Sequence, residues 1–229
     1  GCIHQSYILD GGERSYFVKL NRATERPVFE AEREALEAIH QSTSIRVPRA
    51  IGCGSFENQS FLAMERLCFG RPGSHSWQEM GAQLAALHRS TADQFGWPSA
   101  NYIGASPQQN HWTGNWSEFF REQRLRPQLK MANQAGIHLR KRDALFDAAE
   151  AILGEHRTEP SLLHGDLWSG NAGFLQDGSP VVYDLASYYG DREADLAFSE
   201  FFGGFPGAFY QAYLAAWPLP AGYERRKIL

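Results

Sequence analysis

Hydrophobic and polar positions near the start of the chain alternate as they do in β-strands. Tyr7–Leu9 and Ser15–Leu20 are two such runs, and the turn residues Asp10–Gly12 lie between them, so this segment predicts a β-hairpin. From Pro27 to about His40 the apolar positions instead recur at helical spacing, and a proline suits the first turn of a helix. The chain therefore begins with a predicted hairpin followed by a predicted helix.

The pattern changes beyond the next two predicted strands. Strands are expected at Ala50–Gly52 and Phe61–Leu67, and a break rich in glycine and proline follows at Gly70–Gly73. Beyond the break the apolar spacing is mainly helical, over Trp77–His88, Trp116–Leu129 and Ala144–Leu153. We therefore predict an α+β fold with two lobes, a small β-rich lobe over residues 1–66 and a larger, mainly helical lobe over residues 67–229.

A second pair of short strands carries polar residues at a specific spacing. Ser161–Leu163 and Pro180–Tyr183 are short apolar runs, and glycines punctuate the turns between them. His164-Gly165-Asp166 and then Asn171 come after the first run, and Asp184 directly follows the second. Two carboxylates and one amide therefore lie at strand-to-loop junctions, where a rigid sheet can aim them.

This spacing is typical of phosphoryl-transfer sites. In such sites one Asp orients the substrate hydroxyl, and an Asn and a second Asp hold magnesium. The sequence assigns these roles to Asp166, Asn171 and Asp184 respectively. Asp166 or Asn171 taken alone could simply cap a turn, but a turn has no need of a second Asp eighteen residues further on. The set therefore predicts phosphoryl transfer, with ATP and Mg²⁺ as cofactors.

Lys19 ends an apolar strand, where a charge is costly without a partner. We expect Lys19 to contact the nucleotide phosphates and a carboxylate of the following helix to orient it. Glu32 is the candidate, because it lies three residues after Phe29 and four before Leu36 and so shares their inward face. The alternative for Lys19 taken alone is a lysine at the strand edge that points to water.

Two further segments are candidates for nucleotide contacts. The candidate residues are Met64, Glu65, Arg66 and Leu67 in one segment and Cys2 and Ile3 in the other. The first segment meets the break between the lobes, where the free backbone groups of an edge strand could bond an adenine; an ordinary edge strand is the alternative. The second, Gly1–Gln5, could cover the phosphates, although it lacks a Gly-x-Gly-x-x-Gly pattern. No Gly-x-x-x-x-Gly-Lys-Ser/Thr run is present, which excludes a standard P-loop.

Aromatic side chains near the predicted site favour a sugar as the acceptor. Trp168 lies two residues after Asp166, and an aromatic ring beside a base suits a sugar, which is apolar on its face and hydroxylated at its edges. Trp116 belongs to a dense patch with Phe119 and Phe120 that suits a core as well as ligand stacking. Trp168 and Trp116 are the candidate substrate contacts, together with the base Asp166.

Neighbouring polar residues receive structural roles. His164 is expected to hold its loop through backbone hydrogen bonds and not to act as a base. Asp191–Asp195 opens the next helix and is expected to cap it and to brace the magnesium loop by ion pairs. His88 is expected to be an ordinary core or surface histidine.

Composition limits the partners and the compartment. At 229 residues and 43% hydrophobic content the chain can bury a real core, while a net charge of −4 without a basic stripe argues against nucleic acid. No run approaches the roughly 18 apolar residues of a membrane span. The three cysteines are odd in number and lack Cys-x-x-Cys spacing, which fits a reducing, cytoplasmic location. The chain starts at Gly1 without Met and stops at Leu229 in mid-pattern, so both natural ends are expected to be missing.

Together these residues resemble the fructosamine kinase (ketosamine 3-kinase) family, within the wider protein-kinase-like and aminoglycoside-phosphotransferase-like fold. The matching stretches extend over nearly the whole chain. They are Phe17–Leu20, Phe29–Glu32, Met64-Glu65, Asn115–Arg124, His164–Asn171 and Tyr188–Glu193. The Leu-Trp-Ser-Gly-Asn ending of the catalytic run is more specific to this family than its His-x-Asp start, which many small-molecule kinases share.

The resemblance implies a deglycation activity. It implies ATP-dependent phosphorylation of the 3-hydroxyl of the sugar in a fructosamine, ribulosamine or erythrulosamine, free or protein-bound, which destabilises the adduct and releases the amine. The family usually has Pro-Ala after the metal Asp, whereas this chain has Leu185-Ala186 and so lacks the restraint that proline places on φ. Two alternatives stay open: a kinase of the same fold for another metabolite, such as an aminoglycoside or choline, and a catalytically weak pseudokinase.

The resemblance also implies a role for Cys2. Members of the family place a cysteine in the phosphate turn, and its oxidation there is linked to dimers and altered activity. Backbone N–H groups and Lys19 would lower the pKa of the Cys2 thiol and favour the thiolate, so we hypothesise a redox switch in a monomer or redox-linked homodimer. The alternative is that Cys2 packs as a small buried hydrophobe.

Overall fold

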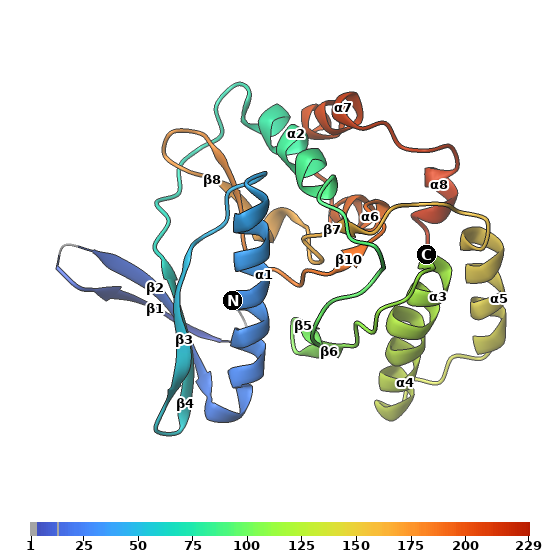
Figure 1. Ribbon diagram of the computed structural model, residues 1–229, viewed down its shortest axis with the longest axis horizontal. Helices are drawn as coiled ribbons and strands as arrows, with labels where there is room; N and C mark the ends of the chain where they lie inside the picture. The colour runs from blue at the N-terminus through green and yellow to red at the C-terminus, as the bar shows by residue number, and fades with distance from the viewer. Residues whose placement is uncertain (1–3, 13) are drawn as a thin grey trace.

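The structure has a sheet-rich region and a helical region (Figure 1). This computed structural model describes residues 4–12 and 14–229. Strands β1 (Gln5–Asp10), β2 (Ser15–Arg22), β3 (Ala50–Phe56) and β4 (Gln59–Glu65) form an antiparallel sheet in the order β1-β2-β4-β3. The predicted α+β fold, with one β-rich and one mainly helical part, is confirmed.

The predicted hairpin at the start of the chain is also confirmed. β1 pairs antiparallel along its whole length with the first six residues of β2, and Gly12, with a φ of 84°, takes a turn conformation that glycine adopts without strain. β4 pairs with β2 on one side and with β3 on the other. It is therefore an interior strand, and the expectation that Met64 lies on an edge strand is wrong.

Helix α1 (Arg26–Ser42) lies between the sheet and the helical region (Figure 1). A proline occupies its first turn, and it ends where Thr43 takes a left-handed conformation with a φ of 53°. Its buried positions are Phe29, Ala31, Glu32, Ala35, Leu36 and Ile39. The predicted helix is confirmed, and Glu32 shares its buried face.

The rest of the chain forms helices and three short strand pairs (Figure 1). Its helices are α2 (Ser76–His88), α3 (Trp116–Phe119), α4 (Arg126–Gln134), α5 (Arg142–Leu153), α6 (Glu193–Phe201), α7 (Gly207–Ala216) and α8 (Tyr223–Arg226). The strand pairs are β5 (Asn101–Ile103) with β6 (Ser106–Gln108), β7 (Ser161–Leu162) with β10 (Tyr189–Gly190), and β8 (Ala172–Phe174) with β9 (Pro180–Val182). The two short strands predicted around the polar constellation are thus present, as β7 and β9.

The single helix predicted over Trp116–Leu129 is interrupted. After α3 the chain forms a π-helical segment, η2, at Phe120–Leu125, and α4 follows it. Asn115 caps the first turn, because its side chain accepts a hydrogen bond from the backbone N–H of Glu118 at 3.0 Å. Segments of π-helix occur frequently at functional sites, and this one carries the half-buried Arg124.

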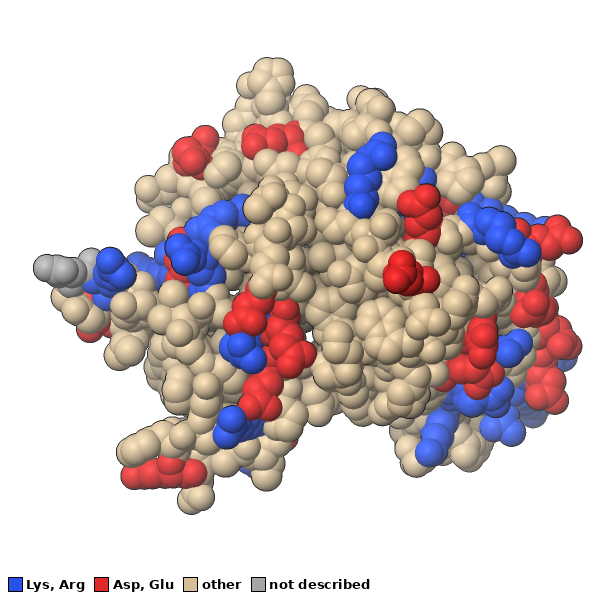
Figure 2. All heavy atoms as spheres, viewed as in Figure 1, with Lys and Arg blue, Asp and Glu red and all other residues tan. Residues whose placement is uncertain are grey.

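Charged side chains of both signs lie close to one another on the face that Figure 2 shows. On α1, Arg26 pairs with Glu30 and Arg33 with Glu37, each at 2.7 Å and one helical turn apart. Within the described part of the chain, no helix is long and apolar enough to cross a membrane.

Helices α2 and α7 pack closely at a glycine. A Cβ added to Gly81 would lie 2.2 Å from the carbonyl oxygen of Phe209. We expect Gly81→Ala to destabilise the protein by about 1–3 kcal/mol, because α7 must move away. Gly207→Ala, on α7 itself, is the control, since its added Cβ meets nothing within 4 Å. Urea unfolding measures both, and an unchanged free energy of unfolding in Gly81→Ala would contradict this close packing.

Candidate active site

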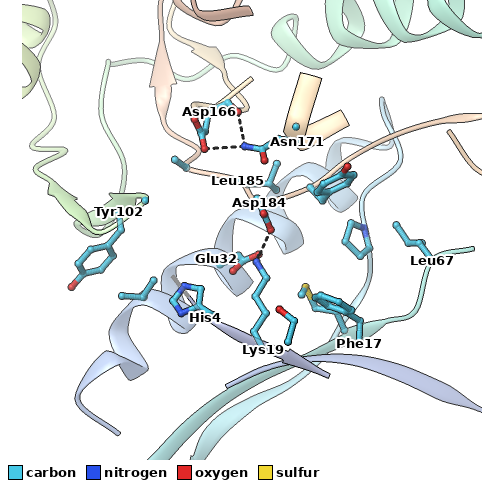
Figure 3. A pocket seen from close by; sticks show the side chains of 18 of the residues that line it. His4, Phe17, Lys19, Glu32, Leu67, Tyr102, Asp166, Asn171, Asp184 and Leu185 are labelled. Carbon is cyan, nitrogen blue, oxygen red and sulfur yellow. Dashed lines mark hydrogen bonds and ion pairs between the residues drawn. The ribbon is translucent and has the colours of Figure 1, made fainter. Parts of the chain in front are cut away.

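A cavity of about 800 Å³ is lined by residues of both regions. The predicted site residues that line it are Lys19, Glu32, Met64, Glu65, Arg66, Leu67, Asp166, Trp168, Asn171 and Asp184. Figure 3 shows the side chains of Lys19 and Asp184 meeting in the middle of the cavity, with Leu67 and Tyr102 on opposite sides of this pair. The fold therefore gathers residues that are far apart in the sequence around one space.

Lys19 is buried and binds two carboxylates. Its Nζ lies 2.5 Å from Oε1 of Glu32 and 2.5 Å from Oδ1 of Asp184. Burial alone would lower the pKa of Lys19, but the two carboxylates outweigh burial and raise this pKa above its usual value. Lys19 is therefore a fixed cation at the cavity wall, as a contact to phosphates requires.

Asn171 holds Asp166 in place. Its Nδ2 donates to the backbone carbonyl oxygen and to Oδ2 of Asp166, each at 2.9 Å. Both amide hydrogens are thereby used, which leaves Oδ1 of Asn171 available to a cation. In the metal-free protein, burial raises the pKa of Asp166 to about 6; the hydrogen bond from Asn171 opposes this rise, and the charge of Asp184 adds to it.

The turn that carries Asp166 passes very close to the segment after Asp184. Gly165 has a φ of 83°, and a Cβ added to it would lie 2.1 Å from the carbonyl oxygen of Ala186. His164 accepts a hydrogen bond at Nδ1 from the backbone N–H of Asp166, at 3.1 Å, which agrees with its expected role of holding the loop. Glycine at position 165 thus sets the spacing between Asp166 and residues 184–187, called the metal loop below after the role predicted for Asp184.

Asp184 has a left-handed backbone, with a φ of 58°. Among residues other than glycine, Asp and Asn tolerate this conformation best. Its side chain is 45% exposed and faces the cavity. Leu185, at the position where the family usually has proline, is buried and lines the same cavity. The leucine therefore serves as an apolar wall residue at the position where proline would restrain the backbone.

Asp195 braces the turn that carries Asp166, and not the segment around Asp184. Its carboxylate accepts hydrogen bonds from the backbone N–H groups of His164 at 2.7 Å and Gly165 at 2.9 Å, and from His88 Nε2 at 3.1 Å. Burial alone would raise the pKa of Asp195, but the bond from His88 and the bonds to the turn lower it overall. The expectation of ion pairs to the magnesium loop is wrong, because the first turn of α6 faces the backbone of the catalytic turn.

His156, Asp191 and Glu193 also lie close enough together to hold an ion. They are already paired: His156 Nε2 bonds Asp191 at 2.7 Å, and Glu193 accepts from Arg226 at 2.6 and 2.7 Å. Asp191 also accepts from the backbone N–H of Glu193 at 3.1 Å, whereas the N-cap residue of α6, Arg192, makes no side-chain capping hydrogen bond. The internal pairs account for this cluster, whereas the predicted metal ligands line the cavity.

The two candidate tryptophans differ in position. Trp168 lines the cavity, is 36% exposed and lies 5.6 Å from the ring of Phe202. Trp116 is 5% exposed and stacks on Phe119 at 5.6 Å within the core. The inward face of α3 carries Trp116 together with Phe119, so the structure does not bring Trp116 to the cavity.

The segment that leaves β4 forms the wall on the side of Leu67 (Figure 3). Met64 is buried and lines the cavity, and Glu65 pairs with Arg46 at 2.5 Å. Because β4 ends at Glu65, the backbone groups of Arg66 and Leu67 lie beyond the ladder of the sheet. These groups, and not those of an edge strand, are the ones left for a nucleotide base.

Cys2 and Ile3 lie outside the described residues, so the structure does not place the predicted phosphate turn or its cysteine. His4 is described; it lines the cavity and bonds the side chain of Asn21 at 2.8 Å. Cys53 and Cys68 are free thiols.

Sequence reasoning missed the cavity residues of β2 and of the β5–β6 hairpin. Phe17 lines the cavity two residues before Lys19, so strand alternation was a usable signal. Asn101, Tyr102 and Gly104 also line it. Asn101 and Tyr102 lie on β5 and Gly104 lies in the turn that follows it, and strands of three residues are too short to produce a recognisable pattern.

Comparison with known proteins shows which proteins the chain is similar to. A family model described as "Fructosamine kinase" matches residues 1–229. A probable ketoamine kinase of Synechocystis sp. is 48% identical, covering 100% of this chain and 78% of that protein. One from Escherichia coli K12 is 38% identical and covers 99% and 79%. The crystal structure of a candidate fructosamine-3-kinase from Haemophilus somnus has a TM-score of 0.94 at 32% identity, covering 99% of this chain and 77% of that one.

More distant structures share the fold. The aminoglycoside phosphotransferase APH(4)-Ia, in a ternary complex with ADP and hygromycin B, has a TM-score of 0.64 at 16% identity and covers 99% of this chain and 81% of that one. The fold is thus that of the protein-kinase-like and aminoglycoside-phosphotransferase-like enzymes, and the protein is a kinase that transfers phosphate to a hydroxyl. Within that class, the chain belongs to the fructosamine kinase family.

Asp166→Asn is expected to stabilise the metal-free protein relative to wild type. The folded-state pKa of about 6 exceeds the usual 3.8, so the folded protein binds this proton more tightly than the unfolded chain does. Wild type should therefore lose stability relative to Asp166→Asn as the pH rises from about 4 to about 6, with a constant difference above that range. Denaturant unfolding of both proteins in EDTA across this range measures the effect. A difference that does not change with pH would contradict the raised pKa.

Proposed function

We propose that the protein transfers the γ-phosphoryl group of ATP to the 3-hydroxyl of the sugar in a ketosamine. The observation that carries the proposal is one cavity lined by Lys19, Asp166, Asn171 and Asp184, in a chain of the fructosamine kinase family. The proposed acceptors are fructosamines, ribulosamines or erythrulosamines, free or attached to protein. Phosphorylation would destabilise the adduct and release the amine, a deglycation activity that we assign to the cytoplasm.

The proposed reaction asks mainly for positioning. Asp166 orients the acceptor hydroxyl and takes its proton as the oxygen attacks. A bond forms between this oxygen and the γ-phosphorus, and the bond from the γ-phosphorus to the bridging oxygen breaks, which leaves ADP. Lys19, held by Glu32, neutralises charge on the phosphates. Most of the rate enhancement would come from placement and from charge neutralisation.

Asn171 and Asp184 suit magnesium as ligands. An amide oxygen and a carboxylate are hard donors of the kind that Mg²⁺ prefers, and the bonds of Asn171 Nδ2 to Asp166 leave its amide oxygen available. Asn171 and Asp184 would hold the magnesium ion, which would supply positive charge to offset the charge that develops on the phosphates during transfer.

The charges around the cavity favour a sugar-amine over a polycationic aminoglycoside. Glu32 is paired with Lys19 and Glu65 with Arg46, so the remaining carboxylates among the described lining residues are those proposed for the base and the metal. The exposed ring of Trp168 suits the face of a sugar. An ATP-consumption screen of fructosyl-, ribulosyl- and erythrulosyl-amines against an aminoglycoside and choline tests this choice; turnover of either rival alone would exclude the ketosamine assignment.

Asp166→Asn should reduce phosphorylation of a ribulosyl-amine by roughly a hundredfold or more, because the general base is lost. Asn at this position can still accept the hydrogen bond from Asn171, so ATP binding should be unchanged. Asp177→Asn is the matched control, since Asp177 lies in an exposed turn and bonds Ser179. Steady-state rates and ATP titration measure both variants. Turnover in Asp166→Asn close to that of an active wild type would remove Asp166 from its role as the base. A wild type as slow as the variant would instead favour the pseudokinase alternative.

Asp184→Asn should weaken magnesium-dependent ATP binding, because a hard cation loses an anionic ligand. Asn tolerates the left-handed backbone of this position, its amide oxygen can still accept the hydrogen bond from Lys19, and Lys19 keeps Glu32 as its ionic partner, so the change removes one charge while the loop can keep its conformation. Calorimetric titration of ATP with and without magnesium separates the two effects, and only the affinity measured with magnesium should fall. Equal magnesium dependence in wild type and variant would rule out Asp184 as a ligand.

A further inference from the structure

The β5–β6 hairpin forms one wall of the cavity. Asn101, Tyr102 and Gly104 line it, and Figure 3 shows Tyr102 on the far side of the Lys19–Asp184 pair from Leu67. Because the segment around Leu67 is proposed to meet the nucleotide base, Tyr102 lies toward the phosphate end of the cavity. This is the end at which an acceptor must enter.

Arg124, on the π-helical segment η2, is a half-buried cation with no carboxylate partner among the described residues. Burial lowers the pKa of Arg124, and among the described residues the opposing influence comes from Tyr188 and not from an Asp or Glu. Its guanidinium lies 4.0 Å from the ring centroid of Tyr188 and 4.6 Å from that of Phe119. Taking a charge partly out of water is costly. The position of this guanidinium therefore needs an explanation, and its hydrogen bonds provide one.

The guanidinium of Arg124 begins a series of hydrogen bonds that ends at Ser187, on the metal loop. Arg124 donates to the carbonyl oxygen of Gln109 at 2.7 Å and to Oδ1 of Asn110 at 2.7 Å. Asn110 Nδ2 donates to Oδ1 of Asn101 at 2.9 Å, and Asn101 Nδ2 donates to the carbonyl oxygen of Ser187 at 2.8 Å. A guanidinium can only donate, so it fixes the orientation of both amides.

The hairpin is thereby tied to both regions of the molecule. Ser99, just before β5, donates to Oε2 of Glu34 on α1 at 2.8 Å, and Ser187 lies three residues after Asp184. Asn101 and Asn110 are each 3% exposed. The amide groups of Asn101 and Asn110 all have hydrogen-bond partners, and such a buried network is rigid, so the position of this wall relative to the metal loop is fixed.

We propose that the β5–β6 hairpin is the acceptor-side wall, that Tyr102 contacts the ketosamine, and that Arg124 is a positioning residue that fixes this wall against the metal loop. The identity of the acceptor rests on the proposed function. A tyrosine offers a ring to the face of a sugar and a hydroxyl to its edge, which matches the chemistry of a sugar-amine.

Separate Michaelis constants for acceptor and ATP test the role of Tyr102. In Tyr102→Ala the KM for a ribulosyl-amine should rise about three- to tenfold, the range expected for loss of one aromatic contact, while the KM for ATP stays within about twofold. Tyr102→Phe should separate the ring from the hydroxyl by retaining the ring's share of the effect. An unchanged acceptor KM in Tyr102→Ala, or an equal rise in both constants, would overturn the assignment.

Arg124→Lys tests the positioning role, because lysine keeps the charge and loses the planar fork. Hydrogen–deuterium exchange should increase at residues 101–108 and 184–188, and the acceptor KM should rise. Arg126→Lys is the matched control, since Arg126 lies 4.8 Å from the ring of Phe146 and bonds Glu122 away from this chain of hydrogen bonds. Exchange that is unchanged in Arg124→Lys, or equally increased in Arg126→Lys, would overturn the role.

Asn110→Asp provides a second variant if Arg124→Lys does not fold. An Asp there still accepts from Arg124 but cannot donate to Asn101, so the same increase in hydrogen–deuterium exchange is expected. Unchanged exchange would count against the series of hydrogen bonds from Arg124 to Ser187. Exchange requires no turnover. If wild type phosphorylates no ketosamine, the proposed function and the Tyr102 contact both fail, while exchange still decides the role of Arg124.

Discussion

The ammonium group of Lys19 is shared by two carboxylates from distant parts of the chain, and the arrangement of the site depends on this pairing. Glu32 comes from α1, and Asp184 lies 165 positions after the lysine. Leaving a buried charge without its partner costs several kcal/mol, of order 3–5, so β2, α1 and the metal loop must meet at one place. The interaction that joins the two regions also puts a cation where phosphates are proposed to bind.

The turn of residues 164–166, which carries Asp166, is held mainly through its backbone. Asp195 binds two N–H groups of the turn, and the glycine at position 165 allows it to approach the carbonyl oxygen of Ala186. Asp184 occupies a left-handed conformation, which persists only where the surroundings hold it. The ion pair with Lys19 and the packing of Leu185 supply that support. Local strain at the metal loop is therefore offset by contacts from β2 and from the cavity wall.

Much of this arrangement could be predicted from the sequence because its signals are local. The hairpin, α1 and the inward position of Glu32 follow from spacing within short windows, and the order Asp166, Asn171, Asp184 carries the chemistry. The interior position of β4 could not be predicted, because it depends on which strands pair across the sheet. Trp116 was ambiguous, since an aromatic at helical spacing suits a core or a ligand.

Other features depend on contacts that no short window encodes. The hydrogen bonds of Asp195 to the turn that carries Asp166 join residues about thirty positions apart. The series of hydrogen bonds from Arg124 to Ser187 passes through two side-chain amides whose orientation only the folded structure defines. These long-range hydrogen bonds decide how rigidly the wall and the base are placed.

The central claim is that the cavity built around Lys19 transfers phosphate to one particular hydroxyl of a sugar-amine. The position of the phosphate on the product tests this claim most directly. In a phosphorus–proton correlation spectrum of a ribulosyl-amine incubated with the protein, ATP and magnesium, the account predicts a new phosphorus signal coupled to the proton on carbon 3 of the sugar. Coupling to a different sugar proton, or release of inorganic phosphate without a phosphorylated sugar, would contradict it.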